Sequence, residues 1–135
     1  MSANTVTAST TVVLLLKFIY IQLIFFYSVK TRMIKAILIR ENLGDLQEID
    51  LDIAPHKNEI FKILEGRQTF IGQWPEIDVV IMKPEDGKVK NENTLPHPFD
   101  VEDVYGKILL VRMDENSEPR DFTLREYRRY KRLPV

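Results

Sequence analysis

The sequence predicts an α+β fold, a small antiparallel-dominated sheet of about four strands with two helices, behind an N-terminal apolar segment. Two apolar segments that flank a short turn predict a β-hairpin, and two later β-branched segments predict further strands. Two other segments carry apolar residues at helical spacing. The composition, 44% hydrophobic and 29% charged, is that of a folded domain.

The hairpin is expected over residues 34–40 and 46–52. The first segment is almost continuously apolar, which predicts a central strand covered on both faces. The second segment alternates, with Ile49 and Leu51 between acidic neighbours, which is typical of a half-buried strand. The turn signal at residues 42–45 joins the two strands.

A first helix is expected from Pro55 to Glu65. Proline suits the first turn of a helix, and glycine at position 66 is a common stop. The predicted stripe that lies on the sheet consists of Ile60, Phe61 and Leu64.

The middle of the chain predicts one strand and a long polar loop. Residues 70–74 fit a short strand or a loop, and Trp74 at their end is expected in the core or as a lid. Residues 77–82 are apolar and β-branched, which predicts a strand. Residues 83–99 are polar and rich in proline, so we expect a loop there.

The end of the chain predicts a strand, a loop and a helix. The strand is expected over residues 108–113 and the loop over 114–119. Thr123 followed by Glu126 matches a capping box, so a helix is expected from Leu124 to about Arg132.

The N-terminal segment from Val12 to Val29 leaves three interpretations open. It contains 13 Val, Leu, Ile or Phe residues, and as a helix its 18 residues would span about 27 Å, close to the thickness of a bilayer core. A membrane anchor is one interpretation, and basic residues after Val29 would then place the domain in the cytoplasm. A cleaved signal peptide fits less well, because no basic residue precedes the segment.

The third interpretation is a mis-called leader upstream of a start at Met33. The expected strand begins directly after this methionine, so residues 33–135 would form a single α+β domain and residues 1–32 would be an anchor or a leader. With an anchor the protein is a single-pass membrane protein, and without it the protein is soluble in the host cytoplasm. The sequence leaves open whether translation starts at Met1 or at Met33.

The net charge of −1 conceals an acidic body and a basic end. Residues 33–121 carry 11 basic and 19 acidic residues, a balance of −8, whereas residues 122–135 carry five basic residues and one acid, a balance of +4. The basic residues alternate with two tyrosines. The candidate interaction residues are therefore Arg125, Tyr127, Arg128, Arg129, Tyr130, Lys131 and Arg132.

Three readings of this basic segment remain open. It is a solvated helix whose Leu124 and Tyr127 pack on the sheet, a contact for a protein or membrane surface, or a small nucleic-acid-binding surface. The acidic body argues against broad nucleic-acid binding, because its charge repels phosphates within a Debye length. A non-enzymatic interaction domain that binds a protein or membrane surface is the favoured function.

Evidence for catalysis is sparse. No cysteine is present, which excludes thiol catalysis and cysteine-based zinc sites, and no glycine-rich phosphate loop occurs. Neither a catalytic residue nor a cofactor is predicted. One alternative is a metal-dependent hydrolase, in which His97 and the acids Asp100, Glu102 and Asp103 hold a divalent cation. Their spacing matches no known loop, so the sequence favours a protein that is not an enzyme.

The order of elements also carries a resemblance. A strand reading Met-Ile-Lys-Ala-Ile-Leu-Ile is followed by an acidic hairpin, a short helix and a strand reading Ile-Asp-Val-Val-Ile-Met. Then come Tyr-Gly-Lys-Ile-Leu-Leu-Val-Arg and Asp-Glu-Asn-Ser-Glu-Pro-Arg-Asp-Phe-Thr-Leu-Arg-Glu-Tyr. This layout over residues 33–132, most specific over 105–127, resembles an uncharacterised domain family of large nucleocytoplasmic DNA viruses. That family is similar in layout to small phage and bacterial domains of unknown function. The resemblance implies a viral setting and no catalytic residues.

Overall fold

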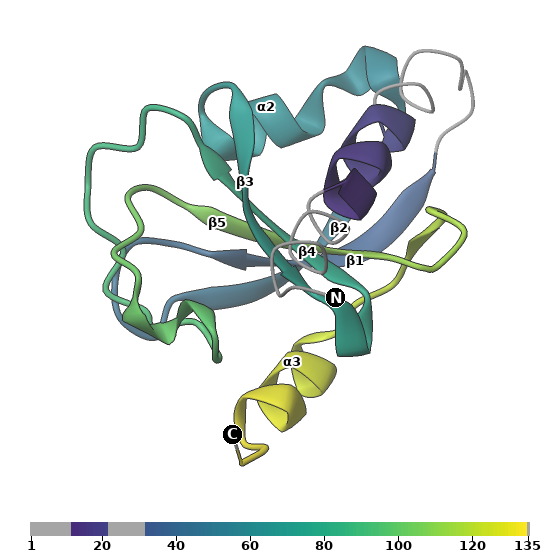
Figure 1. The fold of residues 1–135 in the computed structure, drawn as a ribbon. Helices are drawn as coiled ribbons and strands as arrows, with labels where there is room; N and C mark the ends of the chain where they lie inside the picture. Colours follow the sequence, from purple (N-terminus) through teal and green to yellow (C-terminus); the bar gives the residue numbers. More distant parts are fainter. Residues whose placement is uncertain (1–11, 22–31, 135) are drawn as a thin grey trace.

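An antiparallel sheet organises the computed structural model, which describes residues 12–21 and 32–134 (Figure 1). The predicted α+β class is confirmed, but the sheet has six strands and not about four. The strands run in the order β2-β1-β5-β4-β3, and β6 pairs with β5. Their bounds are β1 Met33–Ile39, β2 Leu46–Asp52, β3 Gln68–Trp74, β4 Val79–Pro84, β5 Ile108–Met113 and β6 Pro119–Arg120.

Two strands lie outside the predicted four: β3, where residues 70–74 were predicted as a short strand or a loop, and β6, which was not predicted. β3 changes register between Phe70 and Gly72, so its residues do not alternate in a simple way. β6 has only two residues and lies at the end of the predicted loop. Both depend on pairing with a neighbouring strand, which a local pattern does not report.

The predicted hairpin is confirmed. β1 and β2 pair from Met33↔Asp52 to Ile39↔Leu46. β1 pairs with β5 along its other edge, and Ile34 and Ala36 face one core while Ile37 and Ile39 face the other. The near-continuous apolar run therefore marks a strand that is covered on both faces, as predicted.

The first predicted helix is shorter than expected. A 3₁₀ turn, Pro55–Lys57, precedes α2, Glu59–Leu64. Asn58 separates the two with a φ of 53°, a left-handed conformation that interrupts a continuous helix. The helix also ends at Leu64, one residue before the predicted end at Glu65, because Glu65 takes the left-handed cap with a φ of 58°. Phe61 of the predicted stripe is exposed.

Later elements keep the predicted order with small shifts. A 3₁₀ turn over Pro75–Ile77 delays the start of β4 to Val79. β5 has the predicted bounds, and α3, Leu124–Lys131, begins at the predicted residue. A further 3₁₀ turn, Phe99–Val101, begins at the end of the predicted polar loop. That loop is tied to the sheet by buried Asn91, whose Nδ2 donates to the Ile39 carbonyl of β1 at 3.3 Å.

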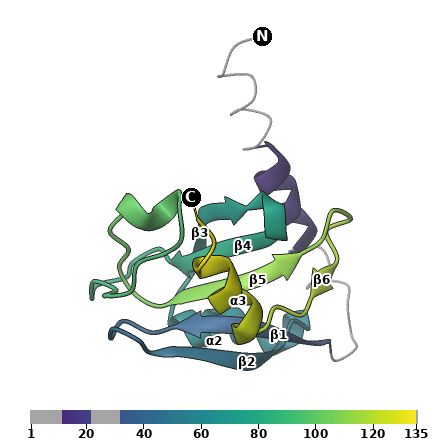
Figure 2. The same ribbon diagram turned by 90° about the horizontal axis from the view of Figure 1, so that it is seen from below.

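Two cores lie on opposite faces of the sheet, because successive residues of a strand point to opposite sides. In β4 and β5, Val80, Met82, Leu109 and Val111 belong to one core. Val79, Ile81, Ile108 and Leu110 belong to the other. Figures 1 and 2 place α2 and residues 12–21 over the first face, and α3 over the second. We call these the first and second faces of the sheet.

Residues 12–21 form a helix that packs on the first face. Ile21 is buried in that core, and the ring of Phe18 lies edge-on to Phe70 with centroids 4.9 Å apart. In the described part of the chain, no helix combines the length and the hydrophobicity needed to span a bilayer. The membrane-spanning helix of the anchor interpretation is thus not found there, and residues 22–29 of that segment lie outside the described residues. The division of the chain at Met33 stays a prediction.

Candidate functional site

Six of the seven residues that the sequence predicts for interaction lie on α3, and the seventh, Arg132, follows directly after it. The start of α3 is fixed by the predicted capping box. The Glu126 amide donates to Thr123 Oγ1 at 3.2 Å, and the Thr123 amide donates back to Glu126 Oε1 at 3.2 Å. Such a cap stabilises a helix by about 1 kcal/mol. It therefore holds a short helix in a defined orientation at the end of the chain.

The inner side of α3 is aromatic. Tyr127 is only 1% exposed, and its ring lies 6.3 Å from both the Phe122 and the Trp74 rings, centroid to centroid. Burial raises the pKa of the Tyr127 phenol above its ordinary value. Trp74 is fully buried and its indole N–H donates to the His97 carbonyl at 3.2 Å, so the core position expected for this residue is confirmed.

Arg112 on β5 attaches α3 to the sheet. Its Nη1 lies 2.7 Å from Glu126 Oε2 and donates to the Asp121 carbonyl at 3.0 Å. Its guanidinium also lies over the Phe122 ring, 4.9 Å from the centroid. Burial alone would raise the pKa of Glu126, but hydrogen bonds from Arg112 and Thr123 outweigh it and the pKa is lowered. The single acid of α3 is thus already paired.

Tyr130 lies at the border between the core and the surface. It is half-buried, its ring centroid is 5.5 Å from that of Trp74, and its hydroxyl donates to the Glu76 carboxylate. Burial, together with this hydrogen bond, raises the pKa of the Tyr130 phenol. Both tyrosines of the predicted surface therefore point toward the second core, and Tyr127 offers no surface to a partner.

The outer side of α3 is basic. The five basic side chains are exposed, and none of them forms an ion pair with a residue in the described ranges 12–21 and 32–134. Four of them recur at helical spacing and share one side of the helix over a length of about 10 Å. These four are Arg125, Arg128, Arg129 and Arg132. We call the four arginines together with Lys131 the basic surface.

A hollow of about 310 Å³ lies beside the C-terminal end of α3. Its polar lining residues are Glu76, His97, Tyr130 and Lys131, and Leu133 with two prolines completes it. His97 Nδ1 lies 3.4 Å from Asp100 Oδ1 in an exposed pair. The hollow is open to solvent, and its carboxylate is occupied by the Tyr130 hydroxyl.

The ligand set of the predicted metal site does not assemble. Asp100 lies next to His97, but Asp103 pairs with Lys90 at 3.2 Å. Within the described ranges, no group of three or more histidine and acidic side chains is placed to hold a metal ion. The hydrolase alternative therefore gains no support from the geometry.

Three residues that position the site escaped the sequence reasoning: Arg112, Glu76 and Trp74 as a contact of α3. Glu76 and Trp74 lie far from α3 in the sequence, 54 residues in the case of Glu76 and Tyr130, whereas Arg112 lies 14 residues before its partner Glu126. An isolated arginine inside the apolar strand at 108–113 was the available signal for Arg112, because a charge in a central strand needs a partner.

Comparison with known proteins gives one match. The model of a family described as a family of unknown function (DUF5880) matches residues 37–130. This range extends from within β1 to the last turn of α3 and includes the Arg112–Glu126 pair. No curated protein and no solved structure matches the chain.

Proposed function

The chain belongs to the DUF5880 family of unknown function, and we propose that it is a non-enzymatic interaction domain that binds an acidic surface of a partner protein through α3. The observation that carries this proposal is the basic surface. Four exposed cationic side chains stand on one short helix and a fifth, Arg132, on its C-cap, and the only acid of that helix is engaged by Arg112. Its charge is therefore available to a negatively charged partner.

The orientation of the tyrosines favours a protein over a nucleic acid. Binding to single strands relies on exposed aromatic rings on which bases stack. Tyr127 is buried, and Tyr130 is held against Trp74 and Glu76. The body over residues 33–121 also carries a balance of −8, which repels a long phosphate backbone more than it repels a small acidic patch. The nucleic-acid reading is thus the alternative outcome of the test below.

The expected affinity is modest. Exposed ion pairs contribute about 0–1 kcal/mol each, so the basic surface alone gives a transient complex whose association is accelerated by electrostatic attraction. Such a contact weakens with salt. A tight complex would need apolar contacts in addition, and the hollow beside Leu133 is the nearest place for them.

The test measures binding of a fluorescent polyglutamate peptide and of labelled single- and double-stranded DNA by anisotropy. The variant Arg125→Gln/Arg128→Gln/Arg129→Gln should weaken peptide binding at least about tenfold, a loss of about 1.4 kcal/mol. The matched control is Lys57→Gln/Lys62→Gln/Arg67→Gln. It removes three exposed charges around α2, beside the opposite face of the sheet, and should change the affinity less than about twofold.

Two results would overturn the proposal. Equal weakening by both triple variants would mean that only net charge matters. DNA that binds more tightly than the peptide, depends on the three arginines and dissociates steeply between about 50 and 200 mM salt would replace the protein partner by nucleic acid.

We also propose the biological setting in which the domain acts. The resemblance to a domain family of large nucleocytoplasmic DNA viruses supports a viral accessory role. Localisation depends on the start of translation: a start at Met33 leaves the domain in the host cytoplasm, and a start at Met1 adds the apolar segment. Ribosome profiling at initiation sites distinguishes the two.

A further inference from the structure

We propose that the outer side of the helix over residues 12–21 rests on the surface of a lipid bilayer of uncharged headgroups, without crossing it, while α3 points away from that surface. This inference extends the proposed function and does not depend on it. It uses a different helix on the opposite face of the sheet.

The helix has an inverted distribution of polarity. Its only charged residue, Lys17, is 6% exposed and points inward. The ammonium group donates to the Met113 carbonyl at 3.3 Å and lies 3.9 Å from Asp78 Oδ1. A helix that faces water places its charges outward, whereas a helix that faces lipid turns ionisable groups toward protein partners. The polarity of residues 12–21 matches the second arrangement.

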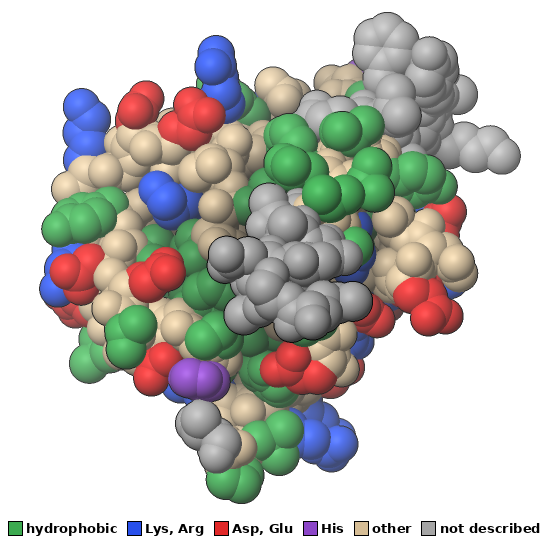
Figure 3. Space-filling view, viewed as in Figure 1, with side chains coloured by type: hydrophobic (Ala, Val, Ile, Leu, Met, Phe, Trp, Pro, Cys, Tyr) green, Lys and Arg blue, Asp and Glu red, His purple; other side chains and the backbone are tan. Residues whose placement is uncertain are grey.

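The exposed side chains of the helix over residues 12–21 are aliphatic or aromatic. Six of the ten residues are between 36% and 58% exposed: Val12, Val13, Leu15, Leu16, Ile19 and Tyr20. Val12, Leu16 and Ile19 recur at helical spacing and form one stripe. Figure 3 shows hydrophobic side chains gathered where Figure 1 places this helix. An exposed apolar stripe of this kind marks an interaction surface.

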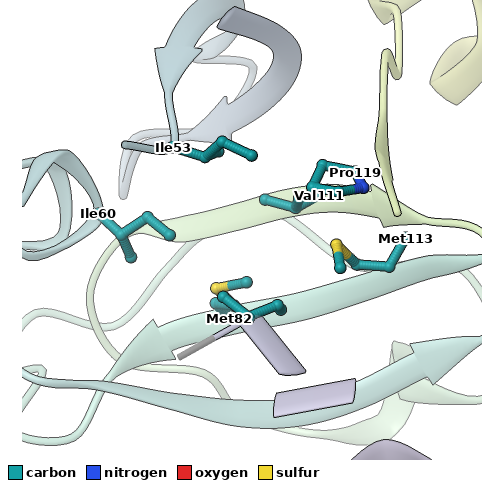
Figure 4. Close-up of a pocket in the computed structure, with 7 residues that line it drawn as sticks. Ile53, Ile60, Met82, Val111, Met113 and Pro119 are labelled. Carbon is teal, nitrogen blue, oxygen red and sulfur yellow. The ribbon is translucent and has the colours of Figure 1, made fainter. Parts of the chain in front are cut away.

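The inner side of the helix packs into the core of the first face, with Ile21 buried there and Leu14 against it. Ile21 is buried and helps to line a small apolar hollow of about 10 Å³ on the first face of the sheet. Figure 4 shows the side chains of Ile53, Ile60, Met82 and Val111 converging on this space from α2, β4, β5 and the segment after β2.

The size of the helix favours lipid over a second copy of the chain. The described part of the helix, residues 12–21, is about 15 Å long and about 10 Å wide. A stable protein interface needs about 800 Å² from each partner, which the exposed side of these ten residues alone does not supply. A bilayer requires no complementary partner surface and accepts a short apolar stripe.

The charges around the helix select the lipid. Asp78 and Glu118 contact the helix through Lys17 and the Tyr20 hydroxyl, and both carboxylates are partly exposed. Each carboxylate is paired with one base, Asp78 with Lys17 and Glu118 with Arg32, so these contacts leave no excess of positive charge to attract anionic headgroups. The basic surface that would attract anionic lipid lies on the other face of the sheet, so one flat membrane does not reach both helices (Figure 1). Uncharged lipid is therefore the expected ligand.

The experiment is flotation of the full chain with vesicles of phosphatidylcholine and with vesicles that also contain phosphatidylserine. The variant Leu16→Gln/Ile19→Gln should reduce recovery with phosphatidylcholine at least about tenfold. The matched control, Val89→Gln/Val101→Gln, removes two exposed aliphatic side chains elsewhere and should leave recovery unchanged. Circular dichroism of each variant confirms the fold.

Three results would overturn the inference. The first is no recovery of the full chain with phosphatidylcholine. The second is binding that requires phosphatidylserine and is abolished by Arg125→Gln/Arg128→Gln/Arg129→Gln, which would assign the membrane contact to α3. The third is a dimer in lipid-free sedimentation that Leu16→Gln/Ile19→Gln dissociates, which would assign the stripe to a second copy. Polyglutamate binding of Leu16→Gln/Ile19→Gln tests the proposed function separately, because α3 is unchanged.

Discussion

The helix over residues 12–21 and α3 cover opposite faces of one sheet and have opposite exteriors. The first turns its single charge inward and its aliphatic side chains outward. The second turns its aromatic side chains inward and its five basic residues outward. Both bury enough apolar surface to pack, so packing constrains only the inner side. The outer sides are free to differ, and the two proposals rest on the difference between them.

The largest effect on the difference between the two faces is expected from removing residues 1–32. Burial of Ile21 contributes about 2 kcal/mol, and the half-buried Leu14 and Phe18 add about 1 kcal/mol each. A chain that begins at Met33 should therefore lose about 4 kcal/mol of unfolding free energy in urea and bind a hydrophobic dye at its first face. Equal stability of the two chains would support the predicted self-sufficient domain from Met33.

The corresponding change on the second face is Tyr127→Ala. Loss of a buried aromatic ring should lower the free energy of unfolding by about 3–4 kcal/mol in a urea titration. Arg128→Ala, one residue further on the exposed side, should stay within about 0.5 kcal/mol. A small effect of Tyr127→Ala would mean that α3 is not held by its aromatic side.

Substitutions of Lys17 test whether its inward charge helps to hold the helix over residues 12–21 on the sheet. Lys17→Glu places a carboxylate next to Asp78 and the Met113 carbonyl, and should cost about 2–3 kcal/mol in thermal or urea unfolding. Lys17→Met keeps the length of the side chain without the charge, and should change stability by less than about 1 kcal/mol. If both variants behave alike, the charge of Lys17 does not contribute to docking.

The smallest expected effect is the pH dependence that Glu126 brings to α3. Its folded-state pKa is lowered, so its contribution to stability is complete above about pH 4.3, the ordinary pKa of glutamate. The contribution is lost as the pH falls through the lowered pKa. Because the carboxylate is partly exposed, the change should stay below about 1 kcal/mol. Glu126→Gln keeps the capping box and should remove this part of the acid dependence in urea titrations at successive pH values.

The parts of the fold that the sequence predicted are those with a strong local period. The hairpin, β5 and α3 follow from alternation, a β-branched segment and the capping box at Thr123. The division of the first helix at Asn58 was missed because its left-handed conformation has no clear signal in the pattern. β6 was missed because two residues carry no period.

For the candidate site, too, residues close together in the sequence were predicted, and contacts between distant segments were not. The basic residues of α3 are visible in the sequence, and so is the step from Leu124 to Tyr127 that turns an aromatic side inward. The partners of that side come from elsewhere in the chain: Arg112 from β5, Glu76 from a 3₁₀ turn and Trp74 from β3. The inward position of Lys17 also depends on Asp78 and Met113, which a hydropathy pattern does not connect with it.

The position of Trp74 equips the protein with an optical probe of its own. It is the single tryptophan of the chain, and it is enclosed by Phe99, Tyr127 and Tyr130 beneath α3. Undocking of α3 would let water reach the indole and shift its fluorescence to longer wavelength. Because residues 12–21 contain no tryptophan and lie on the other face, their release would leave that emission nearly unchanged. The two ends of the molecule can thus be followed separately without attaching a dye.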